Sequence, residues 1–309
     1  MLRNNKSYIH YKALLEARSS KLTALLLLLV PAFMPGCSPK TSFGDIGAKP
    51  KAAFTVTPVA GKVNTYLLTS TTNEAFYFRW NIGDGGGARQ GKKVDTAYYP
   101  DMGNYTIKLL VMSDGGLDSA TAQVNVAADD PNGCAGRKAL LTGCTSKTWV
   151  LDQPAGGALV VGPPSGGPWW TSGEGDVTGR PCAFNDEYTF KKDGTFILDL
   201  KGDIRVDDEG GNPWPTDIGF PVGCINVSQL PNKYKPWGGG TFNFKVIANN
   251  KLKVIGNGAY MALYKAGENG TSGNPEPEIT YDILEMTATK MVINKKYDWG
   301  QWTFTFKAK

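Results

Sequence analysis

Histidine is almost absent from this sequence of 309 residues, and its absence narrows the chemistry open to the protein. The single histidine, His10, lies within the first 36 residues, which have the features of a removable leader. The rest of the chain has no histidine for a catalytic triad, for general base catalysis or for metal binding. An enzyme that uses a pair of carboxylates, as glycosidases do, stays possible.

The net charge of the chain is small as well. The whole sequence has 33 basic and 28 acidic residues, a net charge of +5. Residues 1–36 hold five of the basic residues and only Glu16 on the acidic side, so removing them leaves 28 against 27, a net charge of +1. A nearly neutral chain gives no electrostatic basis for binding nucleic acid, and we expect no such partner.

Long hydrophobic runs are missing. The most pronounced run, Leu22–Val30, is too short to span a bilayer and is soon followed by Pro35, Gly36 and Cys37. This segment resembles a bacterial lipoprotein signal, which implies cleavage before Cys37 and lipidation of that cysteine. An ordinary signal peptide is the alternative. We expect anchoring to the outer membrane at the cell surface, with a periplasm-facing anchor as the alternative. Residues 37–51 then form a polar tether.

Cysteine is sparse, and no two cysteines have C-x-x-C spacing. Four remain after Cys37, an even number that is typical of disulfides formed in an oxidising compartment. A zinc site is the weaker alternative, because no histidine accompanies these cysteines. Three pairings are possible, and we predict Cys134 with Cys144, closing a small loop, and Cys182 with Cys224, joining two long loops.

Helix-forming runs are rare after the leader, whereas turn-forming and aromatic residues are common. The sequence has 38 glycines, 19 prolines and 11% aromatic residues, which suits short strands joined by many turns. The predicted fold class is all-β. We expect an immunoglobulin-like β-sandwich at residues 52–128, a linker at 129–139, and a larger β-sandwich or jelly roll without helices at 140–309.

The first domain carries five predicted strands at sandwich-like spacing: Phe54–Val56, Tyr66–Leu68, Phe76–Trp80, Asn104–Val111 and Ser119–Val126. Its segment Tyr77–Gly85, YFRWNIGDG, is similar to the W-D-F-G-D-G signature of polycystic-kidney-disease (PKD) domains. Gly103–Ile107 is similar to their later G-x-Y-T-V strand. The resemblance implies a module that acts as a spacer or binds weakly.

In the second domain apolar residues alternate along predicted strands, and one hairpin can be aligned from its sequence. A two-residue turn would set apolar residues opposite charged ones. A three-residue loop ending at Gly194, with a positive φ there, instead pairs Phe190 with Phe196 and Tyr188 with Leu198. We predict the second register. The other alternating pairs and triplets are Trp149/Leu151, Phe242/Phe244/Val246, Leu252/Val254, Ile279/Tyr281/Ile283, Met291/Ile293 and Trp302/Phe304/Phe306.

The eight tryptophans divide by context. Trp80, Trp149 and Trp302 alternate with apolar residues and are predicted to pack in the cores. The others lie in loops beside Gly, Pro, Asn or Asp: Trp169, Trp170, Trp214, Trp237 and Trp299. A single loop tryptophan often folds back over the core, but five in one domain indicate a binding surface.

Sugar binding is the chemistry that suits these loop tryptophans. An indole ring stacks on the apolar face of a pyranose, while polar groups at the rim bond its hydroxyls. Candidate rim residues, chosen by their nearness in sequence, are Asp176, Arg180, Asn185, Asp217 and Gln301. Solvated loop polar residues are the alternative for each of them.

Segments spread over residues 140–309 support the same reading. Trp169–Phe190, Asp193–Phe196, Asn257–Leu263 and Trp299–Phe304 are together similar to a module of Bacteroidota lipoproteins from polysaccharide-utilisation loci, also found attached to β-glucan-degrading enzymes. The resemblance implies a non-catalytic surface glycan-binding protein for a β-glucan such as laminarin. It also implies an outer-membrane glycan transporter as a partner.

Two other function classes stay open at this stage. A glycoside hydrolase needs only a pair of carboxylates, and Glu174, Asp176, Asp186 and Glu187 are candidates. Asp186 and Glu187 are neighbours on a predicted strand, so their side chains point to opposite faces. A purely structural or adhesion lipoprotein is the other alternative, against which the excess of loop tryptophans argues.

The acidic segment Asp203–Glu209 is the remaining candidate for ligand binding. Carboxylates are the usual ligands of calcium, so a structural calcium site is one reading. The segment has no recognisable spacing of calcium ligands, and we favour a solvated acidic turn. We therefore predict no cofactor and no metal site.

Overall fold

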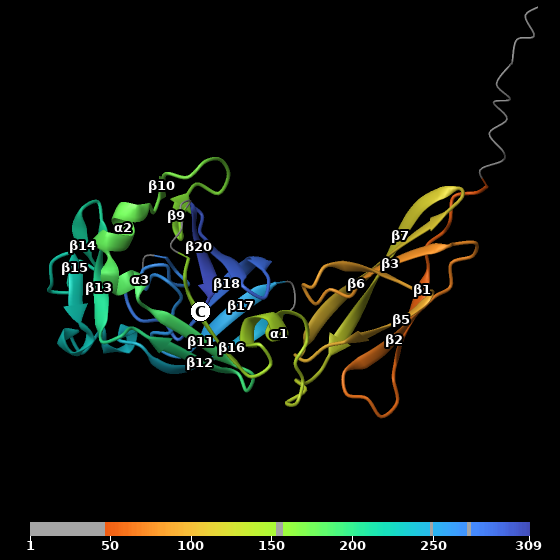
Figure 1. The fold of residues 1–309 in the computed structure, drawn as a ribbon, viewed down its shortest axis with the longest axis horizontal. Coiled ribbons are helices and arrows are strands. Elements are labelled where there is room, and N and C mark those ends of the chain that lie inside the picture. Colours follow the sequence, from red (N-terminus) through yellow and green to blue (C-terminus); the bar gives the residue numbers. More distant parts are fainter. Residues whose placement is uncertain (1–46, 153–156, 248–249, 271–272) are drawn as a thin grey trace, which may run out of the picture. The chain divides into compact units, whose positions relative to one another are not determined.

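The structure, a computed structural model, describes residues 47–152, 157–247, 250–270 and 273–309 (Figure 1). The side chains of these residues form two separate hydrophobic cores. One core lies between Leu68 and Val126 of the sequence and the other between Leu141 and Phe306. The predicted signal peptide and Cys37 fall outside the described residues. Within those residues, no helix is long and apolar enough to cross a membrane.

The first domain consists of two antiparallel sheets that share one core. Fully buried Leu68 comes from one sheet and fully buried Trp80 from the other. All five predicted strands are present, and β4 and β5 are additional. The sheets, in strand order, are β1 (Phe54–Pro58), β2 (Thr65–Ser70) and β5 (Val94–Tyr98), and β4 (Ala88–Gly91), β3 (Tyr77–Asn81), β6 (Gly103–Ser113) and β7 (Gly116–Val126).

In the second domain eight antiparallel strands close into a barrel in which sequence neighbours are also sheet neighbours. They are β8 (Ser146–Leu151), β11 (Glu187–Lys191), β12 (Thr195–Asp199), β16 (Gly240–Ile247), β17 (Lys251–Ile255), β18 (Glu278–Met286), β19 (Lys290–Lys296) and β20 (Gln301–Ala308). The ring closes where Phe306 of β20 pairs with Leu151 of β8. The all-β prediction is confirmed, and the closure is a feature that the sequence did not reveal.

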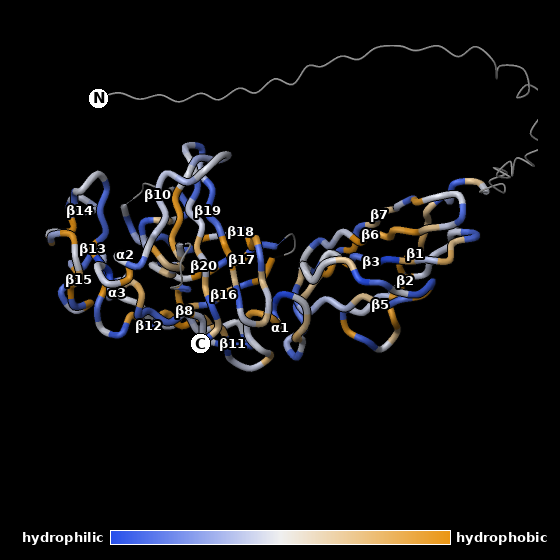
Figure 2. The backbone as a smooth tube through the Cα atoms, turned by 45° about the horizontal axis from the view of Figure 1, so that its top comes forward, coloured by the Kyte–Doolittle hydropathy of each residue, from blue (hydrophilic) through white to orange (hydrophobic). Residues whose placement is uncertain are grey.

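The alternating apolar residues predicted for these strands face the barrel core. Tyr281 of β18 and Phe304 of β20 are fully buried. Apolar segments, orange in Figure 2, recur along the strands of the domain. The predicted hairpin register is confirmed, because Phe190 pairs with Phe196 and Tyr188 with Leu198. Gly194 has a φ of +91°, as the three-residue loop requires.

An up-and-down barrel sends alternate connections to opposite ends, and here the two ends differ. The connections at one end are short: 192–194, 248–250 and 287–289. All the long ones lie at the other end: 152–186 between β8 and β11, 200–239 between β12 and β16, and 256–277 between β17 and β18. The connection 297–300 between β19 and β20 lies there too. This end therefore carries most of the irregular structure.

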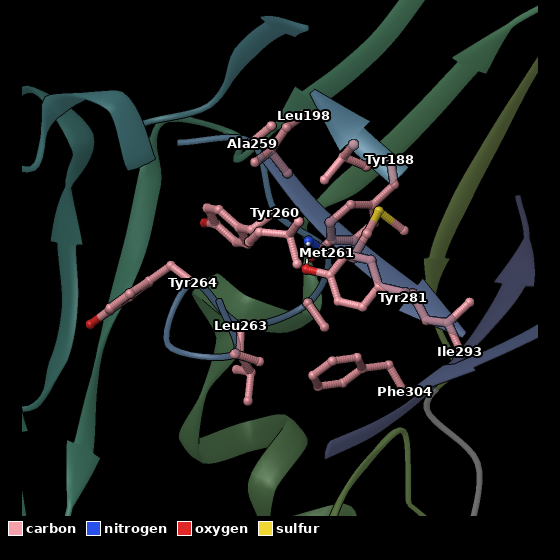
Figure 3. Close-up of a cluster of buried hydrophobic side chains, with 14 of the residues drawn as sticks. Tyr188, Leu198, Ala259, Tyr260, Met261, Leu263, Tyr264, Tyr281, Ile293 and Phe304 are labelled. Carbon is pink, nitrogen blue, oxygen red and sulfur yellow. Dashed lines mark hydrogen bonds between the residues drawn. The ribbon is translucent and has the colours of Figure 1, made fainter. Parts of the chain in front are cut away.

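The barrel interior at this end is filled by the connection between β17 and β18. Tyr260, Met261 and Leu263 from that connection are buried among side chains of the barrel strands (Figure 3). The backbone N–H of Met261 donates to the hydroxyl of Tyr281 at 3.1 Å. Since side chains occupy this interior, a ligand would be bound over the filled end.

Short elements within the long connections shape the surface of that end. The expectation of no helix was wrong: α1 (Gly136–Thr142), α2 (Glu174–Gly179) and α3 (Pro181–Phe184) are single-turn or two-turn helices, too short to show an amphipathic period in the sequence. The remaining elements are β9 (Leu159–Gly162), β10 (Trp170–Thr171), β13 (Asp203–Glu209), β14 (Asn212–Trp214), β15 (Gly223–Asn226) and the 3₁₀ helices η1 (Val227–Gln229) and η2 (Lys235–Trp237).

Both predicted disulfides are confirmed. Cys134 is bonded to Cys144, and Cys182 is bonded to Cys224. The second bond joins α3, in the connection between β8 and β11, to β15, in the connection between β12 and β16. It therefore crosslinks two of the long connections at one end of the barrel.

The prediction that Trp237 contacts a glycan was wrong. Its side chain is only 3% exposed, because η2 turns the indole into the core. There it stacks on Tyr234, with ring centroids 5.1 Å apart, and on Tyr264, at 4.4 Å. The Lys-Pro-Trp-Gly context suggested an exposed loop, but the tertiary fold buries this ring.

We expect Trp237→Ala to lower the free energy of unfolding by about 3–5 kcal/mol, the usual cost of truncating a buried large aromatic side chain. Trp237→Phe, which keeps a ring between the two tyrosines, should lose clearly less. Urea denaturation followed by circular dichroism measures both. An unchanged urea midpoint for Trp237→Ala would contradict the core position.

Asp186, one of the carboxylates considered for catalysis, is also buried and does not line an open cleft. Its Oδ2 accepts a hydrogen bond from the Tyr188 hydroxyl at 3.4 Å, and its Oδ1 has no partner. Burial, reinforced by the nearby charge of Asp203, raises the pKa of Asp186 well above its ordinary value. Glu187 lies apart from it in ion pairs with Lys201 and Lys309.

A raised pKa in the folded state makes the protonated acid the favoured form there. From about pH 4, where an unfolded aspartate ionises, the contribution of Asp186 to stability falls as the pH rises toward its raised pKa. Asp186→Asn is neutral at every pH. We therefore expect the variant to gain on the wild type by up to about 1.4 kcal/mol per pH unit over that window. Thermal melts at pH 4, 6 and 8 test this, and a wild type that gains on the variant would refute it.

Candidate functional site

The four connections at the barrel end that carries the long connections surround a cleft of about 630 Å³. Because each connection is distant from the others in sequence, only the closed barrel brings their side chains together. The residues that line it include Trp169, Trp170, Arg180, Asp208, Glu209, Trp214, Lys265, Gly270, Trp299 and Trp302. Five of the eight tryptophans of the sequence thus meet at one site.

Two of these tryptophans expose their rings to solvent. Trp169 is 59% exposed and Trp299 is 44% exposed. Their rings are nearly parallel, at 18°, with centroids 6.2 Å apart. Tyr297 stacks on Trp299 with centroids 5.0 Å apart and therefore supports it. Together the exposed rings of Trp169 and Trp299 form an aromatic platform.

Glycines allow the close packing beneath this platform. A Cβ on Gly300 would lie 2.5 Å from the carbonyl oxygen of Gly162 and 3.1 Å from the ring of Trp169. A Cβ on Gly270 would lie 2.7 Å from the ring of Tyr297, and the φ of Gly270 is +69°. Any larger residue at either position would displace an aromatic ring. The packing of the platform therefore requires glycine at positions 270 and 300.

Two further tryptophans lie edge to face, with a cation near each ring. Trp170 and Trp302 make a contact with centroids 6.4 Å apart and planes at 71°. The guanidinium carbon of Arg180 lies 5.3 Å from the Trp170 ring centroid, and Nζ of Lys265 lies 5.2 Å from that of Trp302. These distances are typical of cation–π attraction. The cations and the rings therefore hold one another in place.

A buried carboxylate joins the two cations. Asp207, whose side chain is 3% exposed, has Oδ1 2.8 Å from Nη1 of Arg180 and Oδ2 3.2 Å from Nζ of Lys265. Lys265 also donates to the backbone oxygen of Asp208 at 2.7 Å. Arg180, Asp207 and Lys265 come from three different connections, so this ion network ties them together.

Trp214 lies on β14, which pairs with β13, the strand that carries Asp207. It pairs with Asp207 across β13 and β14, and its ring stacks on Tyr264 with centroids 6.0 Å apart. The Tyr264 hydroxyl donates to the backbone oxygen of Trp214 at 2.7 Å and accepts from the N–H of Asp207 at 3.0 Å. Trp214 is half-buried, so part of its ring is available to the cleft.

The sequence-based candidates fall into two groups. Those that line the cleft are Trp169, Trp170, Trp214, Trp299 and Arg180. The other candidates for glycan binding, apart from the buried Trp237, make polar contacts within the fold and are not among the lining residues.

Asp176 accepts the N–H of Gly173 at the start of α2 and lies 3.7 Å from Nε of Arg180, so it helps to orient that cation. Gln301 donates to the backbone oxygen of Pro163 and accepts from Asn294. Asn185 donates to Asp203. Asp217 accepts hydrogen bonds from Lys233 and from the hydroxyl of Tyr234.

Sequence reasoning missed Asp207, Asp208, Glu209, Lys265 and the contribution of Trp302 to the cleft. Asp203–Glu209 was expected to be a solvated turn and is instead strand β13. The alternation of Ile204 and Val206 with charged residues was the available signal. Since Asp207 pairs with two cations, its charge is balanced without a metal, and no described group of acidic, cysteine or histidine side chains could hold one.

Comparisons with solved structures give low overall similarity. The PKD1 domain of Vibrio anguillarum Epp is 20% identical over 26% of this chain and 96% of that one, with a TM-score of 0.23. The PKD1 domain of the Vibrio cholerae metalloprotease PrtV is 20% identical over 26% and 98%, with a TM-score of 0.22. A structure described among carbohydrate-binding modules of the β-sandwich superfamily is 15% identical over 86% and 93%, with a TM-score of 0.25.

Comparisons of sequence concern the first domain. No curated protein sequence matches the chain. The PKD domain family does match, over residues 49–128. This is the segment in which the W-D-F-G-D-G-like and G-x-Y-T-V-like strands occur and in which the two-sheet sandwich forms.

Proposed function

We propose that this protein binds a polysaccharide at the tryptophan-lined cleft and does not cleave it. The observation that carries the proposal is the aromatic platform, in which Trp169 and Trp299 stay exposed beside a cleft of about 630 Å³. Large exposed apolar rings gathered at one place indicate a binding surface. Pyranose rings present apolar C–H faces to such indoles, and the charged groups beside them suit hydroxyls.

The ligand class we propose is a β-glucan such as laminarin, on the strength of the resemblance in residues 140–309. The site is a cleft over a filled barrel end, which suits a segment of a long chain better than a small enclosed ligand. Each contact is weak by itself. A polymer that reaches several anchored copies is held more tightly than by any single site.

A glycoside hydrolase is the second candidate, because Asp208 and Glu209 both line the cleft. Against it, Asp208 lies 3.7 Å from Nη2 of Arg180 and Glu209 lies 3.9 Å from Nζ of Lys265. Both carboxylates are therefore engaged in ion pairs within the fold, whereas hydrolysis needs both carboxyl groups placed against the scissile bond. A structural or adhesion role is the third candidate and gives no reason for an exposed platform.

Affinity electrophoresis tests the function and its rivals together. The purified protein is run through gels containing laminarin, mixed-linkage β-glucan, xylan, mannan or starch, and reducing-sugar release is assayed in parallel. We expect retardation by a β-glucan and no sugar release. Sugar release would support the hydrolase, and migration unchanged in every gel would support the structural role.

Variants of the platform locate the site. We expect Trp169→Ala and Trp299→Ala each to weaken binding roughly tenfold to a hundredfold, the range found for aromatic anchors, with unchanged thermal stability because both rings are exposed. Phe76→Ala is the matched control, since it removes an exposed aromatic ring from the first domain. If the control weakens binding as much as the platform variants do, the cleft is not the site.

We also propose that the chain is anchored through a lipid on Cys37 to the outer membrane, facing outward, where it delivers glycan to a transporter. The leader sequence and the tether support this. We expect the native chain to partition into detergent after membrane extraction, and Cys37→Ser to lose the lipid and appear in the soluble fraction. Mass spectrometry of the N-terminal peptide identifies the modification. A soluble native chain without lipid would point to an ordinary signal peptide.

A further inference from the structure

The charged groups around the cleft form one connected network. Asp207 contacts Arg180 and Lys265, and its Oδ1 also lies 3.9 Å from Nε of Arg205. Asp208 adds a carboxylate 3.7 Å from Arg180, and Glu209 adds one 3.9 Å from Lys265. Asp176 lies on the other side of Arg180, at 3.7 Å.

Counting charges shows that this network is slightly negative. It contains the three cations Arg180, Arg205 and Lys265 and the four carboxylates Asp176, Asp207, Asp208 and Glu209, a net charge of −1. Two of the cations lie beside tryptophans of the cleft, where a bound sugar would meet them. Without the carboxylates these cations would attract an acidic ligand.

The position of Asp207 makes it the central member of the network. Its carboxylate is the one that touches both cleft-lining cations, and its burial reduces the screening of its charge by water and salt. Asp208 and Glu209 are more exposed and each pairs with a single cation at a longer distance. Asp207 therefore neutralises the cleft most effectively.

We infer that Asp207 is a specificity-determining residue: by neutralising Arg180 and Lys265 it restricts the cleft to uncharged polysaccharides and excludes uronic-acid and sulfated ones. This inference rests on the proposed function of the cleft. Asp207 does not need to touch the sugar, since it acts through the two cations. Removing its charge leaves two cations that are paired only at 3.7–3.9 Å with the other carboxylates, and such cations attract carboxylate or sulfate groups.

The test compares a neutral with an acidic probe by isothermal titration calorimetry. The probes are laminarin and polygalacturonate, with the neutral glycan that gives the strongest gel retardation used if it is not laminarin. We expect the wild type to bind polygalacturonate at least about tenfold more weakly than the neutral glycan. We expect Asp207→Asn to bind polygalacturonate about tenfold more tightly than the wild type does, and this gain to disappear in 0.5 M NaCl, since salt screens exposed charges.

A purely structural role for Asp207 predicts a different result, in which Asp207→Asn weakens binding to both probes. Because this variant leaves two partly buried cations without a central partner and can fail to fold, a second variant is needed. Asp208→Asn combined with Glu209→Gln leaves Asp207 in place and should also gain affinity for polygalacturonate. Glu285→Gln is the control, since it removes one carboxylate from the exposed pair with Lys290 on β18 and β19, outside the network.

The outcomes separate this inference from the proposed function. A wild type that binds no neutral glycan refutes the function, whatever the acidic probe does. A wild type that binds both probes equally well leaves glycan binding intact and refutes the role of Asp207. The same role is refuted if Asp207→Asn folds and gains no affinity for polygalacturonate, if the double variant gains none where Asp207→Asn does not fold, or if Glu285→Gln gains as much.

Discussion

The buried carboxylate of Asp207 is the group on which the cleft-bearing end of the second domain depends. A carboxylate with 3% exposure is costly to bury unless cations and hydrogen bonds compensate it, and here Arg180 and Lys265 do so from two other connections. The two cations in turn lie beside Trp170 and Trp302. One charge therefore fixes the relative positions of three chain segments and two indoles, while the disulfide between Cys182 and Cys224 limits how far two of those segments can separate.

The barrel explains why these segments meet at all. In a meander each turn reverses the chain, so connections alternate strictly between the two ends, and length added to every second connection accumulates at one end. In this domain the short turns lie at one end and the insertions at the other. The rigid strands, whose core is filled by large side chains such as Tyr260 and Tyr281, give the irregular end a stable base. Recognition can then be placed on loops without loss of the fold.

How far the sequence predicts this structure depends on whether a feature is local. Strand positions and the register of the hairpin at Gly194 were predictable, because side chains alternate with period two and the turn fixes the pairing. The first domain was predictable from its signature strands. The closure of β20 on β8 was not, since pairing between strands that are distant in sequence leaves no local signal. The two disulfides were within reach because only three pairings existed.

The site shows the same limit more sharply. Trp169 and Trp237 both lie in Gly- and Pro-containing loops, yet the first is exposed and the second is core, because burial is decided by what the rest of the chain packs against the ring. Lys265 has no sequence context that suggests a role, and only the fold sets it beside Asp207 and Trp302. Residue type therefore pointed to the loop tryptophans, four of which line the cleft, but the charged groups beside them are brought there by the tertiary structure. A cleft lined by loop tryptophans thus takes its charged neighbours from segments that lie far away in the sequence.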